Sequence, residues 1–240
     1  MLVKLKVFRF DPQSDKEPRY DSFYVEAKPT DRILDLLNRI RWEQDGSLAY
    51  RMSCAHGICG SDGMTINGIS ALACQKLVKD YEEGKEILVE PLSVFTVVKD
   101  LVVNMEPFFE QEKSVNPPGE IAIKKPASAV ENLQTIEERD MFDDDIKCIM
   151  CACCVGACPV SQKEDPAYVG PAAVLRAHRY IFDSRVKDTA ERLSMMDRPH
   201  GVWSCKSYFK CTQVCPKEIQ VTKHIFEVKR KIIDELRQKK

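Results

Sequence analysis

The spacing of the cysteines most narrows what this chain can fold into. Eleven cysteines occur among 240 residues. Four of them follow one another at x2, x2 and x3 spacings and end in Pro159: Cys148, Cys151, Cys154 and Cys158. A second run from Cys205 to Cys215 repeats the spacing, but Tyr208 stands where its second cysteine is expected. An odd number of cysteines cannot all pair within one chain, so we interpret them as metal ligands in a reducing compartment.

The two runs have the spacing of bacterial two-cluster ferredoxins, in which the fourth cysteine of each run binds the other cluster. This rule predicts a [4Fe–4S] cluster held by Cys148, Cys151, Cys154 and Cys215. Three cysteines remain for the other cluster, which is therefore predicted to be [3Fe–4S]: Cys158, Cys205 and Cys211. We expect Tyr208 to fill the vacant corner and Cys153 to be a buried, small apolar residue. The alternative, a pair of zinc sites, usually uses two separated Cys-x2-Cys pairs and is disfavoured by the interlocked spacing.

The first cysteine group differs from these runs. Cys54 and Cys59 are separated as in plant-type [2Fe–2S] ferredoxins, Asp62 occupies the third ligand position, and Cys74 supplies a distant fourth ligand. The spacing predicts a [2Fe–2S] cluster held by these four residues. The alternative is that Asp62 is a surface residue beside a cluster held in another way, for instance with Ser61. A Rieske centre would need a second Cys-x2-His, which the chain lacks.

Hydrophobic periodicity predicts an α+β fold. Alternation over 2–10, 20–25 and 86–90 is typical of strands, an Asn67-Gly68 turn predicts a hairpin, and apolar spacing over 33–40 predicts a helix capped by Thr30. We expect a domain over 1–105, a connecting segment over 106–145 and a mostly helical domain over 146–240. An apolar stripe is expected on the last helix: Ile225, Val228, Ile232 and Leu236.

Composition excludes several classes of function. The 36 Lys and Arg are matched by 37 Asp and Glu, so the basic excess typical of nucleic-acid binding is missing. No apolar stretch reaches the roughly 20 residues of a membrane span, and we expect no signal or transit peptide. No nucleophile–base constellation or glycine-rich nucleotide loop is recognisable. Three clusters therefore predict a chain that relays electrons and has no substrate-converting site of its own.

Longer segments resemble the iron–sulfur subunit of the succinate dehydrogenase and fumarate reductase (complex II) family. They are CAHGICGSDG at 54–63, DLVVNM at 100–105, the run at 148–159, GPAA at 170–173 and GVWSC at 201–205. The resemblance implies an N-terminal β-grasp plant-type ferredoxin domain and a C-terminal all-α bacterial-type ferredoxin domain. It also implies a flavoprotein partner with covalent FAD, one or two membrane-anchor subunits of the cytochrome b type, often with haem b, and a quinone. Some bacterial members have an aspartate at the position of Asp62.

Two departures concern the quinone. Where many ubiquinone-linked members have a tryptophan shortly after the Cys-Pro of the first run, which ends at Pro159, this chain has Lys163. Where they have a histidine after the first cysteine of the second run, it has Lys206. We expect these three residues near the quinone, and menaquinone in place of ubiquinone or a quinone held by the membrane subunits. The family further implies a peripheral position on the cytoplasmic face of a bacterial inner membrane.

Three alternatives remain open. The same subunit could work in the quinol:fumarate reductase direction. The chain could instead be a multi-cluster ferredoxin that serves another flavoprotein. A soluble, thiol-linked fumarate reductase is disfavoured, because such proteins extend into a further cysteine-rich domain that this sequence does not contain.

Overall fold

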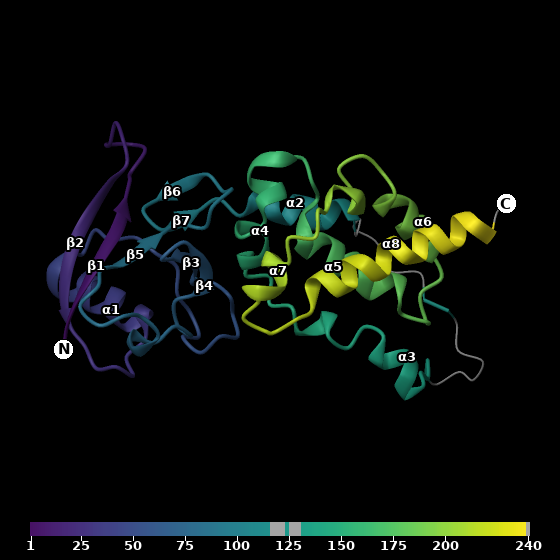
Figure 1. The fold of residues 1–240 in the computed structure, drawn as a ribbon, viewed down its shortest axis with the longest axis horizontal. Coiled ribbons are helices and arrows are strands. Elements are labelled where there is room, and N and C mark those ends of the chain that lie inside the picture. Colours follow the sequence, from purple (N-terminus) through teal and green to yellow (C-terminus); the bar gives the residue numbers. More distant parts are fainter. Residues whose placement is uncertain (116–122, 125–130, 239–240) are drawn as a thin grey trace. The chain divides into compact units, whose positions relative to one another are not determined.

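The elements of the computed structural model fall into two units, which are described separately (Figure 1). The structure describes residues 1–115, 123–124 and 131–238. The first unit comprises 1–105, 149–157 and 214–216, and the second comprises 106–148, 158–213 and 217–240. Two short segments of the cysteine runs thus pack with the N-terminal part of the chain, although they lie in the region predicted as the C-terminal domain.

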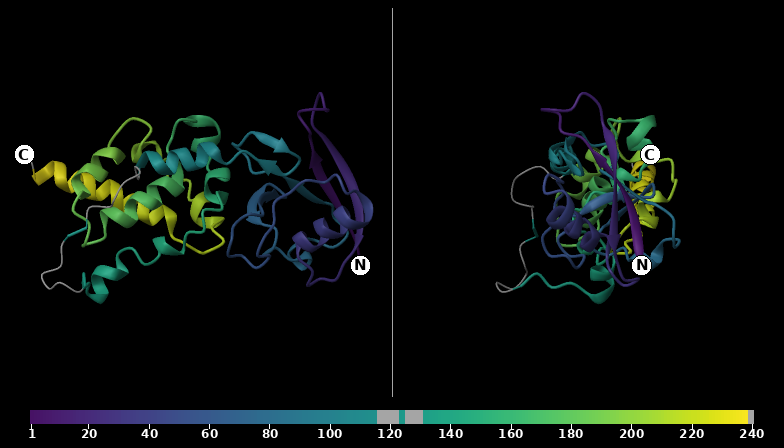
Figure 2. Two further views of the ribbon diagram at one scale, coloured as in Figure 1. Left: turned by 180° about the vertical axis from the view of Figure 1, so that it is seen from behind. Right: turned by 90° about the vertical axis from the view of Figure 1, so that its left-hand side faces the viewer.

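The first unit carries a five-stranded mixed sheet with the strand order β2-β1-β5-β3-β4. β1 pairs antiparallel with β2 and parallel with β5, while β3 pairs antiparallel with both β5 and β4. Figure 2 shows β1 and β2 side by side from behind. A separate antiparallel pair is formed by β6 and β7. The strands are β1 Leu2–Arg9, β2 Arg19–Glu26, β3 Gly63–Ile66, β4 Ile69–Leu72, β5 Ile87–Glu90, β6 Val97–Lys99 and β7 Val102–Val103.

The alternation predicted for the first strand is present. Val3, Leu5 and Val7 are buried on one face of β1, and the residues between them are half-buried. The predicted hairpin is also present, because β3 and β4 are joined by the Asn67-Gly68 turn. Period-two patterning places one face of a strand in the core, which is why these local patterns were informative.

The helix of the first unit begins later than expected. α1 spans Ile33–Arg39 and is capped by Arg32, whose backbone N–H donates to Asp35 Oδ2 at 2.9 Å, so the prediction of Thr30 as N-cap is wrong. A carboxylate in the first turn replaces the hydroxyl cap there. The remaining helical elements of this unit are η1 Ile40–Gln44, η2 Val78–Asp80 and α4 Cys153–Gly156.

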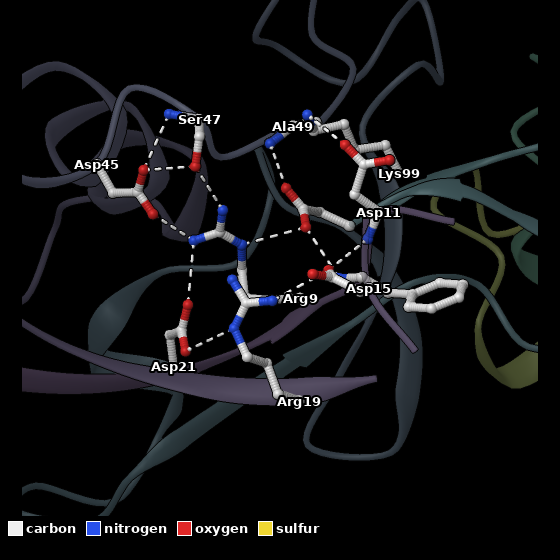
Figure 3. A network of polar contacts seen from close by, with 11 residues as sticks. Arg9, Asp11, Asp15, Arg19, Asp21, Asp45, Ser47, Ala49 and Lys99 are labelled. Atoms are coloured by element: carbon white, nitrogen blue, oxygen red, sulfur yellow. Dashed lines mark hydrogen bonds and ion pairs between the residues drawn. The ribbon is translucent and has the colours of Figure 1, made fainter. Parts of the chain in front are cut away.

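A buried charge network closes one end of β1 (Figure 3). The Arg9 side chain is 4% exposed and donates from Nε to Asp100 Oδ1 at 3.1 Å and from Nη2 to Ser47 Oγ at 2.7 Å. Its Nη1 donates to Asp21 Oδ2 at 3.2 Å and to Asp45. The hydrogen bond from Ser47, followed by that from Arg9, lowers the pKa of Asp45 to about 2. Since buried charges are tolerated only when paired, this network fixes the loops around β1.

The second unit is helical. α5 packs against α2, α6 and α8, and Figure 1 shows α5 and α8 running side by side. Its elements are α2 Glu106–Val115, α3 Ile136–Asp140, η3 Asp145–Lys147, η4 Val160–Glu164, α5 Gly170–Ile181, α6 Thr189–Met196, η5 Val202–Ser204, α7 Lys210–Gln213 and α8 Val221–Gln238. Within the described ranges, no helix combines the length and the apolar character needed to cross a lipid bilayer.

Two predictions for this unit are modified. The predicted connecting segment contains α2, whose Phe108 and Val115 are buried, while residues 116–122 and 125–130 of that segment lie outside the described residues. On α8, Ile225, Val228 and Ile232 are buried as predicted, but Leu236 is exposed. α8 has 18 residues and α5 has 12, so the last turn of α8 extends beyond its main partner.

Candidate iron–sulfur sites

The first cysteine group forms a loop between η1 and β3. The Sγ of Cys54 accepts the backbone N–H groups of His56, Ile58 and Cys59 at 3.5, 3.4 and 3.3 Å. These three bonds lower the pKa of Cys54 to about 7. Since the thiolate is the form that binds metal, the loop prepares Cys54 as a ligand. His56 lies in the loop as a hydrogen-bonding residue, as predicted, with its ring bonded to the carbonyl of Cys54.

Asp62 and Cys74 face each other in the interior of the unit. Asp62 is 2% exposed, and its Oδ2 accepts the backbone N–H of Cys74 at 2.6 Å. Its Oδ1 is buried and accepts no hydrogen bond in the described structure. Burial and the neighbouring Asp62 raise the pKa of Cys74 to about 12. An unpaired, buried carboxylate oxygen beside a buried thiol fits a bound cation, and it is incompatible with the alternative of a surface aspartate. Ser61 lies beside Cys59, with Oγ and Sγ 3.1 Å apart.

Gly60 brings this loop into contact with the first ferredoxin-type run. Its φ is +69°, and a Cβ placed there would lie 2.8 Å from Cβ of Cys151 and 3.0 Å from the carbonyl oxygen of Ile149. Gly63 is similarly close, because a Cβ there would lie 2.9 Å from the carbonyl oxygen of Cys151. The loop of the predicted [2Fe–2S] site therefore touches a segment that carries ligands of the predicted [4Fe–4S] site, within one unit.

The two ferredoxin-type runs have the same local conformation. The first run follows the 3-10 turn η3 and continues into the short helix α4, and the second run follows η5 and continues into α7. The two turns start 57 positions apart (145 and 202), and so do the two helices (153 and 210). The backbone N–H of Cys148 donates to Asp145 O, and that of Cys205 donates to Val202 O. The spacing repeat found in the sequence is thus also a repeat of structure.

Four residues of the runs adopt left-handed backbone conformations at equivalent positions. Their φ values are 55° at Met150, 62° at Ala152, 60° at Ser207 and 61° at Phe209. Alternating right- and left-handed residues turn successive N–H groups toward one point, which creates a concave site for anions. A cluster with cysteinate ligands is such an anionic group, so the backbone of both runs fits the predicted cofactors.

A small cavity of about 20 Å³ lies at the second run. It is lined by the three cysteines predicted for the [3Fe–4S] cluster, Cys158, Cys205 and Cys211. Pro159, Lys206 and Tyr208 also line it. Burial raises the pKa of the Cys211 thiol, whose Sγ lies 3.3 Å from Oγ1 of Thr222. Lys163 is exposed in η4 and does not line this cavity. The structure thus brings the three cysteines of the second ligand set together around one small cavity.

Tyr208 is held by a partner that the sequence did not suggest. Its hydroxyl donates to Oε1 of Glu164 at 2.5 Å, and this bond raises the pKa of Tyr208. The phenol therefore stays protonated, which makes it a poor iron ligand. Glu164 precedes Tyr208 by 44 positions, and no spacing pattern relates the two.

The predicted [4Fe–4S] ligands Cys151, Cys154 and Cys215 belong to the first unit, and Cys148 belongs to the second. Cys153 is buried as predicted, but it is not only a space-filling residue. Its thiol is hydrogen-bonded to Cys151, which lowers the pKa of Cys151, while that bond and burial raise the pKa of Cys153 well above its ordinary value. Cys153 therefore acts as a donor to a predicted ligand. In the sequence, the position of Cys153 directly before the predicted ligand Cys154 was the signal for this role.

Comparisons with known proteins find two iron–sulfur domains in the chain. Residues 4–110 match the model of the family described as a 2Fe-2S iron-sulfur cluster binding domain, and residues 146–219 match that of a 4Fe-4S dicluster domain. These matches, together with the fold, confirm the α+β class with its two ferredoxin-type parts.

Two curated relatives cover nearly the whole chain. The chain is 37% identical over 235 residues to a succinate dehydrogenase iron-sulfur subunit of Coxiella burnetii, covering 97% of this chain and 98% of that protein. It is also 37% identical over 235 residues to the subunit of the same name from Paracoccus denitrificans, covering 97% of this chain and 89% of that protein. A chain of the Mycobacterium smegmatis Sdh1 complex in the apo form superposes with a TM-score of 0.88 at 25% identity, covering 98% of this chain and 96% of that one. Identity of this extent, joined to the cysteine geometry, shows that the chain belongs to the family of succinate dehydrogenase iron–sulfur subunits.

Proposed function

We propose that the chain relays electrons between the covalent FAD of a flavoprotein subunit and a membrane quinone, using [2Fe–2S], [4Fe–4S] and [3Fe–4S] clusters. Membership of the family supports electron transfer within a succinate-oxidising enzyme complex. When bound, the clusters supply one-electron carriers whose potentials depend on their ligands, hydrogen bonds and exposure. The same relay operates in the opposite direction in quinol:fumarate reduction.

The proposed ligand sets follow the cysteine spacing. We assign the [2Fe–2S] cluster to Cys54, Cys59, Asp62 and Cys74. The buried, unpaired Oδ1 of Asp62 supports its role as the oxygen ligand. We assign the [4Fe–4S] cluster to Cys148, Cys151, Cys154 and Cys215. The chain's own contribution is to hold these thiolates, to donate backbone N–H bonds to them and to keep water away.

The observation that carries the proposal is the cavity at the second run. Only three cysteines, Cys158, Cys205 and Cys211, line it among the described residues, and Tyr208 stands at the position of the missing fourth. A cubane that lacks one protein ligand readily lacks the iron at that corner. The protonated phenol of Tyr208, bonded to Glu164, occupies this position without replacing the thiolate. These features support a [3Fe–4S] cluster.

Exposed aromatic side chains of the second unit, two of which line this cavity, support docking to membrane-anchor subunits. They are 40–50% exposed and belong to the second unit: Trp203, Tyr208, Phe209 and Phe226. Aromatic residues of this kind are common at subunit interfaces, because they combine a large apolar area with a polar tip. We place Pro159, Lys163 and Lys206 near the quinone and the subunit on the cytoplasmic face of a bacterial inner membrane, held there by cytochrome b-type anchors.

Replacing Tyr208 tests the assignment. In the purified complex, Tyr208→Cys supplies a fourth thiolate, so we expect the iron content to rise from about nine to about ten atoms per polypeptide. We also expect the EPR signal of the oxidised [3Fe–4S] centre to disappear, the potential of that centre to fall, and quinone reduction to slow. Tyr208→Phe is the matched control, because it removes only the bond to Glu164 and should retain the signal.

An unchanged oxidised-state EPR signal in a fully loaded Tyr208→Cys complex would contradict the assignment of the third cluster. Wild-type iron far below nine atoms per polypeptide in anaerobic material would contradict the whole relay. Extraction of the bound quinone tests the acceptor. We expect menaquinone, and a ubiquinone in contact with Lys163 or Lys206 would contradict that part of the proposal.

A further inference from the structure

A buried group of histidines and carboxylates lies apart from the three cluster sites. Asp145 in η3, His178 in α5 and His224 in α8 have side chains that are 1%, 0% and 4% exposed. One potential ligand atom from each lies within 4.8 Å of the others. Burial of so many ionisable groups is costly unless each one is paired. None of these residues belongs to the cysteine sets, so the electron relay does not account for them.

Glu227 lies between the two imidazole rings. Its Oε2 lies 3.1 Å from Nε2 of His178 and 3.1 Å from Nδ1 of His224. The other nitrogens of the same rings also lie against carboxylate oxygens, those of Asp145 and Asp144, and a carboxylate only accepts hydrogen bonds. A neutral imidazole has a single N–H, so each ring can donate to only one of its two carboxylate neighbours, and its second nitrogen then presents a lone pair to an anion.

The ring nitrogens that do not face Glu227 lie against oxygens of Asp145 and Asp144. Nδ1 of His178 lies 2.6 Å from Oδ2 of Asp145. Nε2 of His224 lies 3.7 Å from Oδ1 of Asp145 and 3.4 Å from Oδ2 of Asp144. A lone pair that faces an anion is unfavourable unless a positive charge lies between them. In addition, Oδ1 of Asp145 is buried and accepts no hydrogen bond among the described residues. The crowding of two rings among three carboxylates and the unpaired Oδ1 of Asp145 both favour a cation bound at this group.

We propose that Asp145, His178 and His224, with Asp144 as the fourth donor, form a closed binding site for a divalent transition-metal ion of the zinc type. Imidazole nitrogens and carboxylate oxygens are common zinc ligands, and structural zinc sites are four-coordinate and closed. Bonds of about 2.0–2.1 Å in a tetrahedron place the donor atoms roughly 3.3 Å apart. One ligand atom each of Asp145, His178 and His224 lie within 4.8 Å of one another, and Nε2 of His224 lies 3.4 Å from Oδ2 of Asp144, so small side-chain rotations reach this geometry.

Glu227 completes the arrangement as an outer carboxylate. Metal-bound histidines generally donate their second N–H to a carboxylate, carbonyl or water, which orients the ring toward the metal. Here one carboxylate oxygen serves both rings. The ion would join η3 to α5 and α8, and η3 immediately precedes the first ferredoxin-type run. The carbonyl of Asp145 accepts the N–H of Cys148 at 3.2 Å, so the ion would anchor the start of that run.

Metal analysis of the full-length chain tests the proposal. The protein is purified anaerobically with its full iron content, dialysed against a chelator of moderate strength, and analysed for zinc and iron. We expect about one zinc per polypeptide in the wild type and none in His224→Gln, with unchanged iron in both. His200→Gln is the matched control, because His200 is exposed and pairs with Asp165, and it should keep its zinc.

A second variant covers the case in which His224→Gln does not fold. Glu227→Gln keeps all proposed ligands but loses the acceptor that orients them, so zinc affinity should fall by roughly 10–100-fold. The proposal is overturned if fully iron-loaded wild type contains no zinc and takes up none when zinc chloride is added. It is also overturned if His224→Gln retains the wild-type zinc content, or if cobalt bound in place of zinc shows thiolate charge-transfer absorption. Absence of zinc from the wild type would mean that shared protons, and not a metal ion, hold the histidines and carboxylates together.

Discussion

Replacing Gly60 by alanine should disturb the contact between two cluster loops. Gly60 has a φ of +69°, and the added Cβ would lie 2.8 Å from Cβ of Cys151. To reach an ordinary contact of 3.4 Å, the two carbons would have to separate by 0.6 Å. The segment that must move carries Cys151 and Cys154, two ligands of the proposed [4Fe–4S] cluster. The substitution therefore strains both the backbone of the first loop and the position of the second.

A matched control separates the backbone cost of the Gly60→Ala substitution from its packing cost. A left-handed conformation costs an alanine roughly 1–2 kcal/mol relative to glycine. Forcing an extra methyl group into a packed site costs a further 1–3 kcal/mol or so. Gly68 has a similar φ of +78° but nothing within 4 Å of its would-be Cβ, so Gly68→Ala isolates the first cost. Each kcal/mol lowers the melting temperature of a chain of this size by about 2–4 °C.

We expect Gly60→Ala to melt roughly 2–12 °C below Gly68→Ala when far-UV circular dichroism is recorded on cluster-loaded protein. All variants are scanned at one rate, because loss of metal makes unfolding irreversible and scan-dependent. Electron transfer from the first cluster to the second should also slow in Gly60→Ala and remain unchanged in Gly68→Ala. Equal melting temperatures and equal transfer rates in the two variants would refute the close approach of Gly60 to Cys151.

Three further predictions concern buried polar contacts. Arg9→Met leaves Asp100, whose side chain is 3% exposed, without its cation, so the protein should lose about 3–5 kcal/mol in denaturant unfolding; wild-type stability would contradict the network in Figure 3. The pKa of Asp45 is about 2 in the folded state against an ordinary 3.8, so its stabilising effect is complete above pH 4 or so and is lost as the pH falls through about 2. In Asp45→Asn, the free energy of unfolding should therefore depend less on pH between about 2 and 4. An unaltered pH dependence would argue against a lowered pKa of Asp45. Cys153→Ala removes the donor to Cys151 and should lower the potential of the [4Fe–4S] centre in a redox titration, while Cys153→Ser should restore it in part; equal potentials in all three proteins would show that the thiol bond has no influence.

Patterns confined to short stretches of chain were predictable. The strand β1 and the hairpin of β3 and β4 appeared as expected, because alternation and an Asn-Gly turn act locally. The N-cap of α1 was predicted at Thr30 but lies at Arg32, since Asp35 supplies the acceptor from within the helix. The burial of α2 was not predicted, because its Phe108 and Val115 gain their apolar neighbours only when α5 packs against it.

The sequence by itself determined the spacing of the cysteine groups and their division between a 2Fe-2S domain and a 4Fe-4S dicluster domain. Ligands on one tight loop must occur at fixed spacings, so the chemistry of a cluster leaves its imprint on a run of about ten residues. It could not reveal the bond from Tyr208 to Glu164, the approach of Gly60 to Cys151, or the meeting of His178 with His224, which lie 44, 91 and 46 positions apart. Such contacts exist only when separate helices and loops pack together, and no local spacing rule encodes that packing.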